Sequence, residues 1–289
     1  MKPMRRVVWR LTVLLCCSWV AAGLTGCSRD TASAQVVSPE AIERITVVGS
    51  STIAPLLSEM GKAYEKMHPN IRIEVQAGGS SRGVLDVRNG MAKLGMVSRE
   101  MRPDEQDLQS ALIARDGVGI ILHKDTPVPR LSRSQVVDIY TGKLKNWRQL
   151  GGNDVPITVV SKAEGRSTLD IFSGYFGVPY KDISAHVIIG DNQQGIQTVA
   201  GSSGAIGYVS IGSAEYEAQQ GAAIRLVPMD DQVPSTAAVA SGRYAISREL
   251  NLVFKSPLSA RLQDFVAFTQ SEAVIELVLG QYFVPTASR

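Results

Sequence analysis

Thiols are scarce in this chain and are confined to its start. The 289 residues include three cysteines, Cys16, Cys17 and Cys27. The rest of the sequence therefore offers no thiol for a disulfide, a metal site or catalysis. It also lacks a Walker-type loop, a dinucleotide fingerprint and any His, Cys, Asp or Glu cluster with metal-ligand spacing. These absences predict a protein with no cofactor and no metal.

The first residues have the pattern of an export signal. Four basic residues precede an apolar run from Leu11 to Leu24, which is too short for a stable membrane span. Leu24-Thr25-Gly26-Cys27 resembles a bacterial lipoprotein signal, in which the peptide is cut before a cysteine that then receives lipid. The resemblance implies a signal peptide over residues 1–26, lipidation at Cys27 and a tether over residues 27–44. A plain secretory signal with an incidental cysteine is the alternative.

Removing this signal leaves the chain almost neutral. Four of the 30 Lys and Arg residues lie in it, so 26 cations face 27 Asp and Glu residues in the remainder. Neither a basic tract nor interleaved basic and aromatic residues are present there. The sequence therefore predicts no nucleic-acid partner. It predicts membrane contact only through the lipid anchor. The expected location is the cell envelope, on the periplasmic side or at the cell surface.

Three apolar runs end in turns rich in serine and threonine, each followed by an amphipathic segment. The runs lie at 45–49, 71–77 and 157–161 and predict strands, while the segments after the turns predict helices. Thr52 is expected to cap the first of these helices, with Pro55 in its first turn. Helix N-termini and nearby hydroxyls supply hydrogen-bond donors, so these turns suit an oxyanion. In open α/β sheets the ligand lies outside the carboxyl ends of the strands. The three turns follow such ends and can therefore converge on one ligand.

The rest of the chain continues the alternation of strands and helices. Residues 103–114 are expected to form a helix, followed by a buried strand at 118–122. This alternation predicts a mainly parallel sheet covered on both faces. Stiff connectors at Pro127-Val128-Pro129 and Val233-Pro234 are candidate crossings between two parts of the fold.

The segment Ile139-Tyr140-Thr141-Gly142-Lys143-Leu144-Lys145-Asn146-Trp147 resembles the periplasmic phosphate-binding proteins of ABC importers. The resemblance extends to the turns after residues 48 and 78 and to 204–209, and covers most of Ile45–Pro285. It implies the two-lobe α/β periplasmic-binding-protein (type II) fold, with a ligand cleft between lobe 1 (45–123 and 241–289) and lobe 2 (124–240). It also implies a monomer without enzymatic activity that captures inorganic phosphate or a related oxyanion and delivers it to ABC permease subunits.

The ligand loops of that family can be matched to this sequence. The third loop usually reads Arg, two residues, then Gly-Ser-Gly-Thr, whereas here Lys162 replaces the arginine and Arg166 stands inside the loop. Some phosphate binders place an Asp where this chain has Ser98-Arg99, which leaves phosphate against sulfate open. Together, the turns and the resemblance predict these ligand-binding residues: Ser50, Ser51, Thr52, Ile53, Ser80, Ser81, Arg82, Ser98, Arg99, Lys162, Gly165, Arg166, Ser167 and Thr168.

Two other functional classes fit parts of the sequence. Gly79-Ser80-Ser81-Arg82-Gly83 matches the nucleophile elbow of α/β-hydrolases, which would make Ser81 a nucleophile. That enzyme also needs a downstream histidine, and His123 and His186 both have the pattern of structural or surface residues. The second alternative is a surface sensor or adhesion protein of the same fold. It stays open because the face that would dock a permease is not readable from one sequence.

Overall fold

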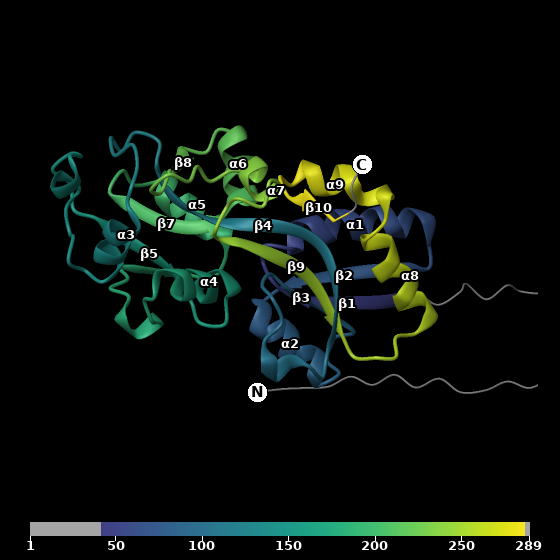
Figure 1. The fold of residues 1–289 in the computed structure, drawn as a ribbon. Coiled ribbons are helices and arrows are strands. Elements are labelled where there is room, and N and C mark those ends of the chain that lie inside the picture. The colour runs from purple at the N-terminus through teal and green to yellow at the C-terminus, as the bar shows by residue number, and fades with distance from the viewer. Residues whose placement is uncertain (1–41, 287–289) are drawn as a thin grey trace, which may run out of the picture. The chain divides into compact units, whose positions relative to one another are not determined.

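Strands and helices alternate along the chain (Figure 1). The computed structural model describes residues 42–286, so the predicted signal peptide, Cys27 and most of the predicted tether lie outside the described residues. The strands are β1 Glu43–Gly49, β2 Ile71–Ala77, β3 Leu94–Val97, β4 Gln109–His123, β5 Thr158–Lys162, β6 Val187–Ile189, β7 Ala205–Ser210, β8 Ile224–Leu226, β9 Ser247–Phe254 and β10 Val284–Pro285. The α-helices are α1 Ala54–Met67, α2 Ser80–Arg88, α3 Arg133–Tyr140, α4 Ser167–Phe176, α5 Asn192–Ala200, α6 Ile211–Gln219, α7 Thr236–Ala240, α8 Ala260–Thr269 and α9 Ile275–Gly280. Short 3-10 helices are η1 Pro103–Glu105, η2 Trp147–Leu150, η3 Tyr180–Asp182 and η4 Glu272–Val274.

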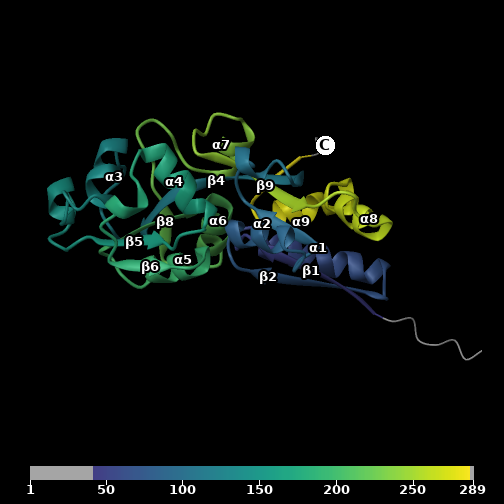
Figure 2. The same cartoon turned by 90° about the horizontal axis from the view of Figure 1, so that it is seen from below.

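One continuous sheet joins these strands in the order β2-β1-β3-β9-β4-β7-β5-β6, with β8 and β10 also pairing with β4. Two groups are parallel, as the alternation predicts: β1 to β3, and β5 with β6 and β7. Strands β4 and β9 run antiparallel to their neighbours, so the sheet is mixed rather than mainly parallel. Figures 1 and 2 show these two strands between the two groups.

The predicted helix at 103–114 is wrong. Only η1 is helical there, and β4 begins at Gln109 and continues for 15 residues through the predicted strand at 118–122. A register shift between Leu112 and Ala114 breaks the two-residue alternation of side chains. From Val118 onward, β4 pairs with β7 instead of β9 and is buried on both faces as far as Leu122. Neither half therefore has the clean periodicity of a surface strand.

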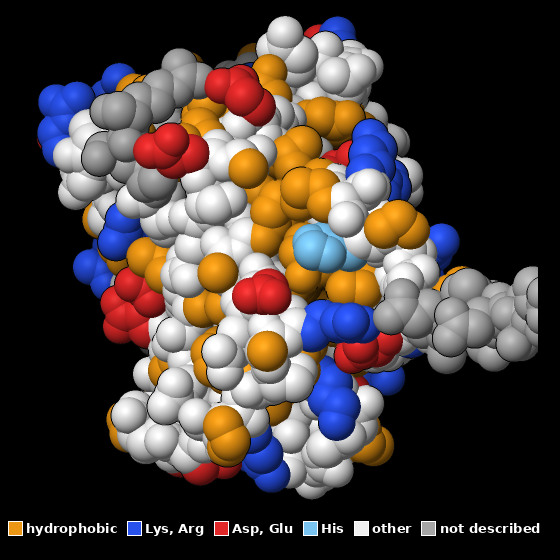
Figure 3. Space-filling model, turned by 90° about the vertical axis from the view of Figure 1, so that its right-hand side faces the viewer, with side chains coloured by type: hydrophobic (Ala, Val, Ile, Leu, Met, Phe, Trp, Pro, Cys, Tyr) orange, Lys and Arg blue, Asp and Glu red, His pale blue; other side chains and the backbone are white. Residues whose placement is uncertain are grey.

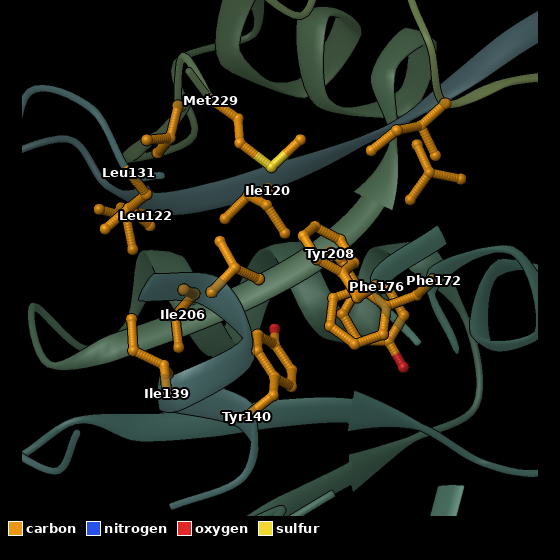
Figure 4. Packing of buried hydrophobic residues seen from close by; sticks show 14 of the residues in the cluster. Ile120, Leu122, Leu131, Ile139, Tyr140, Phe172, Phe176, Ile206, Tyr208 and Met229 are labelled. Carbon is orange, nitrogen blue, oxygen red and sulfur yellow. The ribbon is translucent and has the colours of Figure 1, made fainter. Parts of the chain in front are cut away.

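Separate hydrophobic cores define two lobes within the described residues. In lobe 1, α1, α8 and α9 pack on the sheet around Ile45, Met60 and Phe265. In lobe 2, α3 and α4 cover the sheet around the stacked rings of Phe172 and Tyr208, as Figure 4 shows. Ring contacts of this kind add to the burial of apolar area.

The cores place the crossings elsewhere than the predicted connectors. Val118 in β4 belongs to the lobe 2 core, whereas Ala114 belongs to the lobe 1 core. Val128 and Val239 are both inside lobe 2. From this core membership we propose that lobe 1 is 43–117 with 247–285 and that lobe 2 is 118–246. On this division the chain crosses within β4 and again just before β9, rather than at the proline-containing connectors.

The surface of lobe 1 carries charges of both signs. On the face shown in Figure 3, Lys and Arg side chains lie among Asp and Glu side chains. This face therefore has no single-sign field. Within residues 42–286, no helix combines the length and the apolar character needed to cross a membrane.

Candidate functional site

Strand direction places two sets of loops opposite each other. Because β9 pairs antiparallel with both β3 and β4, strands β1 to β3 point the same way as β4, whose carboxyl half lies in lobe 2. Strands β5, β6 and β7 point back, since β7 pairs antiparallel with β4. The carboxyl ends of both parallel groups therefore face the boundary between the lobes, which is where ligands of α/β sheets lie.

Backbone hydrogen bonds join the three strand-end loops of lobe 1. The N–H groups of Gly78 and Gly79 donate to Gly49 O at 2.7 and 2.8 Å. Ser50 N donates to Met96 O at 2.9 Å, which ties the first loop to the end of β3. The loops after β1, β2 and β3 are thus held as one surface.

Side-chain hydroxyls on this surface accept hydrogen bonds from backbone N–H groups. Ser98 N donates to Ser80 Oγ and Thr52 N donates to Ser50 Oγ, each at 3.2 Å. The Ser50 hydroxyl donates to Ser98 Oγ at 2.8 Å. Because a hydroxyl has one hydrogen to donate, those of Ser80 and Ser98 remain available to a further acceptor. All four residues are buried.

Lobe 2 presents the start of α4 at the same boundary. The helix begins at Ser167 after Arg166 as its N-cap, so its first backbone N–H groups have no partner within the helix. The buried Ser167 Oγ has no hydrogen-bond partner among the described residues. Buried polar atoms are almost always paired, and an unpaired one calls for a water, an ion or a ligand.

A small cavity, partly open to solvent, lies between the two sets of loops. Both lobes line it, with hydroxyls, glycines and two cations: Ser50, Ser51, Thr52, Gly79, Ser80, Ser98, Lys162, Arg166, Ser167, Thr168 and Gly190. Among the described residues, no Asp or Glu lines this cavity. Many short donors without a carboxylate are suited to an anion rather than to a metal ion or an apolar ligand.

Lys162 is the buried cation of this cavity. Lys162 is 1% exposed, and its Nζ donates to Asn192 Oδ1 at 3.0 Å. Burial lowers the pKa of Lys162 to about 7; Asp191 opposes this shift, and Arg248 and Arg166 add to it. An anion in the cavity favours the ammonium form, because a nearby opposite charge stabilises the charged state.

Comparison with known proteins agrees with this architecture. A profile of the PBP superfamily domain matches residues 31–273. The chain belongs to the PBP superfamily. Among curated proteins, it is 27% identical over 250 residues to the phosphate-binding protein PstS of Bacillus subtilis, covering 83% of this chain and 80% of that protein.

Solved structures of PBP-like proteins resemble it as well. A putative phosphate ABC transporter substrate-binding protein from Clostridium perfringens, solved with bound phosphate, superposes with a TM-score of 0.79 at 30% identity. The superposition covers 85% of this chain and all of that one. An ABC-type phosphate transport receptor from Vibrio cholerae gives a TM-score of 0.69 at 26% identity, covering 84% of this chain and all of that one.

This PBP fold brings most of the predicted ligand residues together at the cavity. They come from all the predicted loops: Ser50, Ser51, Thr52, Ser80, Ser98, Lys162, Arg166, Ser167 and Thr168. Thr52, however, is not the N-cap of α1, a position held by Ile53. The Thr52 hydroxyl instead accepts hydrogen bonds from Asn192 and Arg248.

Four other predicted residues do not line the cavity of the PBP fold. The Ile53 side chain is fully buried in the core of lobe 1, because α1 packs on the sheet there. Ser81 and Gly165 meet each other across the lobes, where Ser81 N donates to Gly165 O at 3.3 Å. The exposed Arg82 side chain pairs with Asp86, one helical turn along α2, at 3.2 Å.

Arg99, the fifth, is engaged by an acidic partner. Both of its terminal nitrogens donate to the Glu105 carboxylate at 2.7 Å, and both side chains are buried. Burial alone would raise the pKa of Glu105, but hydrogen bonds from Arg99 and Arg102 outweigh it and lower the pKa. Arg102 also forms an ion pair across the lobes with Asp170 at 2.6 Å. Arg99 thus supports a contact between the lobes rather than the cavity.

Sequence reasoning missed several residues at the site. Gly190 lines the cavity at the turn between β6 and α5, which is another strand-turn-helix of the type that predicted the other loops. Asn192, the first residue of α5, connects Lys162 to Thr52. No local sequence pattern marked Arg248 as part of the site, because its ion-pair partner Asp116 lies 132 positions away.

Proposed function

We propose that this protein captures inorganic phosphate in the cavity between its lobes and delivers it to an ABC permease. The observation that carries the proposal is the cavity itself, in which hydroxyls, helix N-termini and two cations converge without a carboxylate. A small dianion needs many short donors and little apolar surface. The relatives named phosphate-binding proteins, and the phosphate held by the similar Clostridium perfringens structure, support the same ligand.

Hydroxyl direction adds support for an oxyanion over other small ligands. The hydroxyls of Ser80 and Ser98 accept hydrogen bonds from the protein and face the cavity as donors. Sugars and amino acids bring donors of their own and need acceptors or aromatic surfaces in return. Sulfate and related tetrahedral anions match the same donors, and they are the second choice because the relatives are named for phosphate.

Calorimetric titration of the purified protein with phosphate, sulfate and molybdate tests this function. Ser80→Ala and Thr168→Ala each remove one hydrogen-bond donor to a charged ligand, which costs about 1.5–3 kcal/mol, or roughly ten- to a hundredfold in affinity. Ser241→Ala is the matched control, because that serine is exposed and does not line the cavity. Undiminished binding in both cavity variants rejects the site, and no binding of any oxyanion rejects the function.

The ligand is expected to hold the lobes closed. Contacts already cross the boundary beside the cavity, including the Ser81–Gly165 hydrogen bond and the Arg102–Asp170 ion pair. We place the hinge at the two crossings near Gly117 and Ser247. Small-angle scattering should show compaction on addition of saturating phosphate, and identical curves with and without phosphate argue against closure.

Envelope location follows from the start of the sequence. The protein is exported, loses residues 1–26, and is anchored as a monomer by lipid on Cys27. Replacing Cys27 with Ser should release it from membranes, whereas unchanged membrane retention contradicts the anchor. Loss of high-affinity phosphate uptake on deletion of the gene distinguishes a transport protein from a sensor.

The PstS-type relatives are binding proteins, and the geometry around Ser81 gives no support to a hydrolase. The backbone N–H groups of Asp125 and Val159 donate to Nδ1 of His123 and of His186, respectively. Neither histidine lines the cavity or contacts Ser81. A serine-reactive phosphonate should therefore leave Ser81 unlabelled.

A further inference from the structure

A buried ion pair lies where the chain crosses between the lobes. Arg248 of β9 and Asp116 of β4 are directly opposite each other in the strand register, one position before the end of their pairing. The next residues of β4 pair with β7 of lobe 2. Both side chains are 1% exposed. Figures 1 and 2 show β4 and β9 side by side at this point.

The carboxylate fixes the orientation of the guanidinium. Arg248 Nε and Nη2 donate to Asp116 Oδ2 at 3.0 and 2.7 Å. The other oxygen, Oδ1, accepts the N–H of Gly212 from lobe 2 at 3.2 Å. With both carboxylate oxygens engaged, the planar guanidinium is held in one plane and its remaining hydrogens point in set directions.

Those hydrogens meet one cavity hydroxyl from each lobe. Arg248 Nη2 donates to Thr52 Oγ1 of lobe 1 at 3.1 Å, and Nη1 donates to Thr168 Oγ1 of lobe 2 at 3.0 Å. Thr52 Oγ1 also accepts from Asn192 Nδ2 at 3.0 Å. The amide orientation of Asn192 is set by Lys162, whose Nζ donates to Asn192 Oδ1.

The donated hydrogen bonds decide where the threonine hydrogens go. A hydroxyl has two acceptor lone pairs and one hydrogen. Both lone pairs of Thr52 are occupied by N–H donors, so its own hydrogen can serve only as a donor. Thr168 accepts from Arg248 and lines the same cavity. Both hydroxyls are therefore prepared to donate to a ligand between the lobes.

We propose that Arg248 is a positioning residue that aligns the Thr52 and Thr168 hydroxyls toward the anion and joins the two lobes in the closed arrangement. The inference rests on the proposed function, because it names the ligand of the cavity. Arg248 does not itself line the cavity. Its effect on affinity is thus transmitted through the two threonines.

A double-mutant cycle on phosphate affinity tests this role. Arg248→Lys keeps the charge opposite Asp116 but replaces the fork with a single ammonium, which does not reproduce donation to both threonines. It should weaken phosphate binding about tenfold, as should Thr168→Val. If Arg248 acts through the hydroxyls, adding Arg248→Lys to a Thr52→Val/Thr168→Val protein should change affinity by less than about twofold.

A purely structural role gives a different result. The fold-losses then multiply in the combined variant, and this outcome overturns the inference, as does wild-type affinity in Arg248→Lys. If Arg248→Lys does not fold, the same cycle is run with Arg248→Gln/Asp116→Asn, which removes both charges together. Absence of phosphate binding in the wild-type protein rejects the proposed function instead, so the two failures are distinguishable.

Discussion

Replacing Lys162 with methionine should weaken phosphate binding in a strongly pH-dependent way. The side chain of Lys162 is buried in the cavity wall, and its pKa is about 7 when the site is empty. Methionine keeps the apolar length of the side chain and removes the charge. The variant therefore approximates a protein in which Lys162 is permanently neutral.

The expected magnitude follows from the pKa and the strength of a charge-assisted hydrogen bond. Such a bond contributes about 1.5–3 kcal/mol, or roughly ten- to a hundredfold in affinity. At pH 7 about half of the empty protein carries the ammonium, so the wild type should bind about five- to fiftyfold more tightly than Lys162→Met. At pH 9 only about one molecule in a hundred is protonated, and the two affinities should agree within about twofold.

Calorimetric titrations with phosphate at pH 7, 8 and 9 measure this ratio. The ionisation of phosphate itself is the same for both proteins and cancels when they are compared. Lys181→Met is the control, because Lys181 is exposed and outside the cavity. A ratio that stays constant from pH 7 to pH 9 refutes the reasoning, and so does equal binding at pH 7.

The stability of the empty protein should also depend on the ionisation of Lys162. Without an anion, the buried ammonium form lowers stability, whereas with an anion it strengthens binding. The folded pKa of Lys162 lies below its ordinary value of 10.5, so the unfolded state binds more protons between the two values. The burial penalty is fully present below about pH 7 and fades as pH rises toward the unfolded value. Wild-type stability relative to Lys162→Met should therefore increase from pH 6 to pH 9 in phosphate-free thermal unfolding.

Three further substitutions test other parts of the structure. Gly79→Ala should weaken phosphate binding without unfolding lobe 1, because Gly79 has φ +93° and an added Cβ would lie 2.8 Å from Gly165 O of the opposite lobe; unchanged affinity contradicts the closed geometry. Arg102→Ala removes a half-exposed ion pair with Asp170 and should cost about 0.2–1 kcal/mol of closure, seen as an affinity loss of at most about fivefold; a larger loss contradicts that assignment. Phe172→Ala should lower the free energy of unfolding by about 3–5 kcal/mol in denaturant titration, because the ring is fully buried and stacked on Tyr208, and a loss under 1 kcal/mol contradicts the core.

Local sequence patterns were sufficient to predict the ligand loops where a strand, a turn and a helix follow one another directly. The loops at Ser50–Thr52 and at Ser167–Thr168 were predicted because the hydroxyls stand between an apolar run and a helical pattern. Ser132 shows similar short-range chemistry, because it caps α3 and its side chain accepts a hydrogen bond from Gln135 N. Short-range chemistry of this kind is fully contained in a few residues.

Long-range pairing accounts for what the sequence did not reveal. The alternation of β4 is interrupted by its register shift, and its second half is buried on both faces, so periodicity favoured a helix at residues 103–114. Arg99 and Arg82 were indistinguishable from ligand cations until Glu105 and Asp86 were seen to engage them. Arg248 meets the two cavity threonines, Thr52 and Thr168, only because β9 returns to lie beside β4. Asp86 and Glu105 lie near their arginines in sequence, whereas local spacing does not specify the strand partners of β4 or the ion-pair partner of Arg248.

The central claim is that one tetrahedral anion binds among the strand-end loops of both lobes. Arsenate has the geometry and charge of phosphate, and its arsenic atom scatters anomalously, so a crystal grown with arsenate locates the anion directly. The account predicts one dominant anomalous peak in the cavity, with the arsenate oxygens around it within hydrogen-bonding distance of the hydroxyls of Ser80 and Thr168 and of Lys162 Nζ. A peak elsewhere on the chain, or none at saturating arsenate, contradicts it.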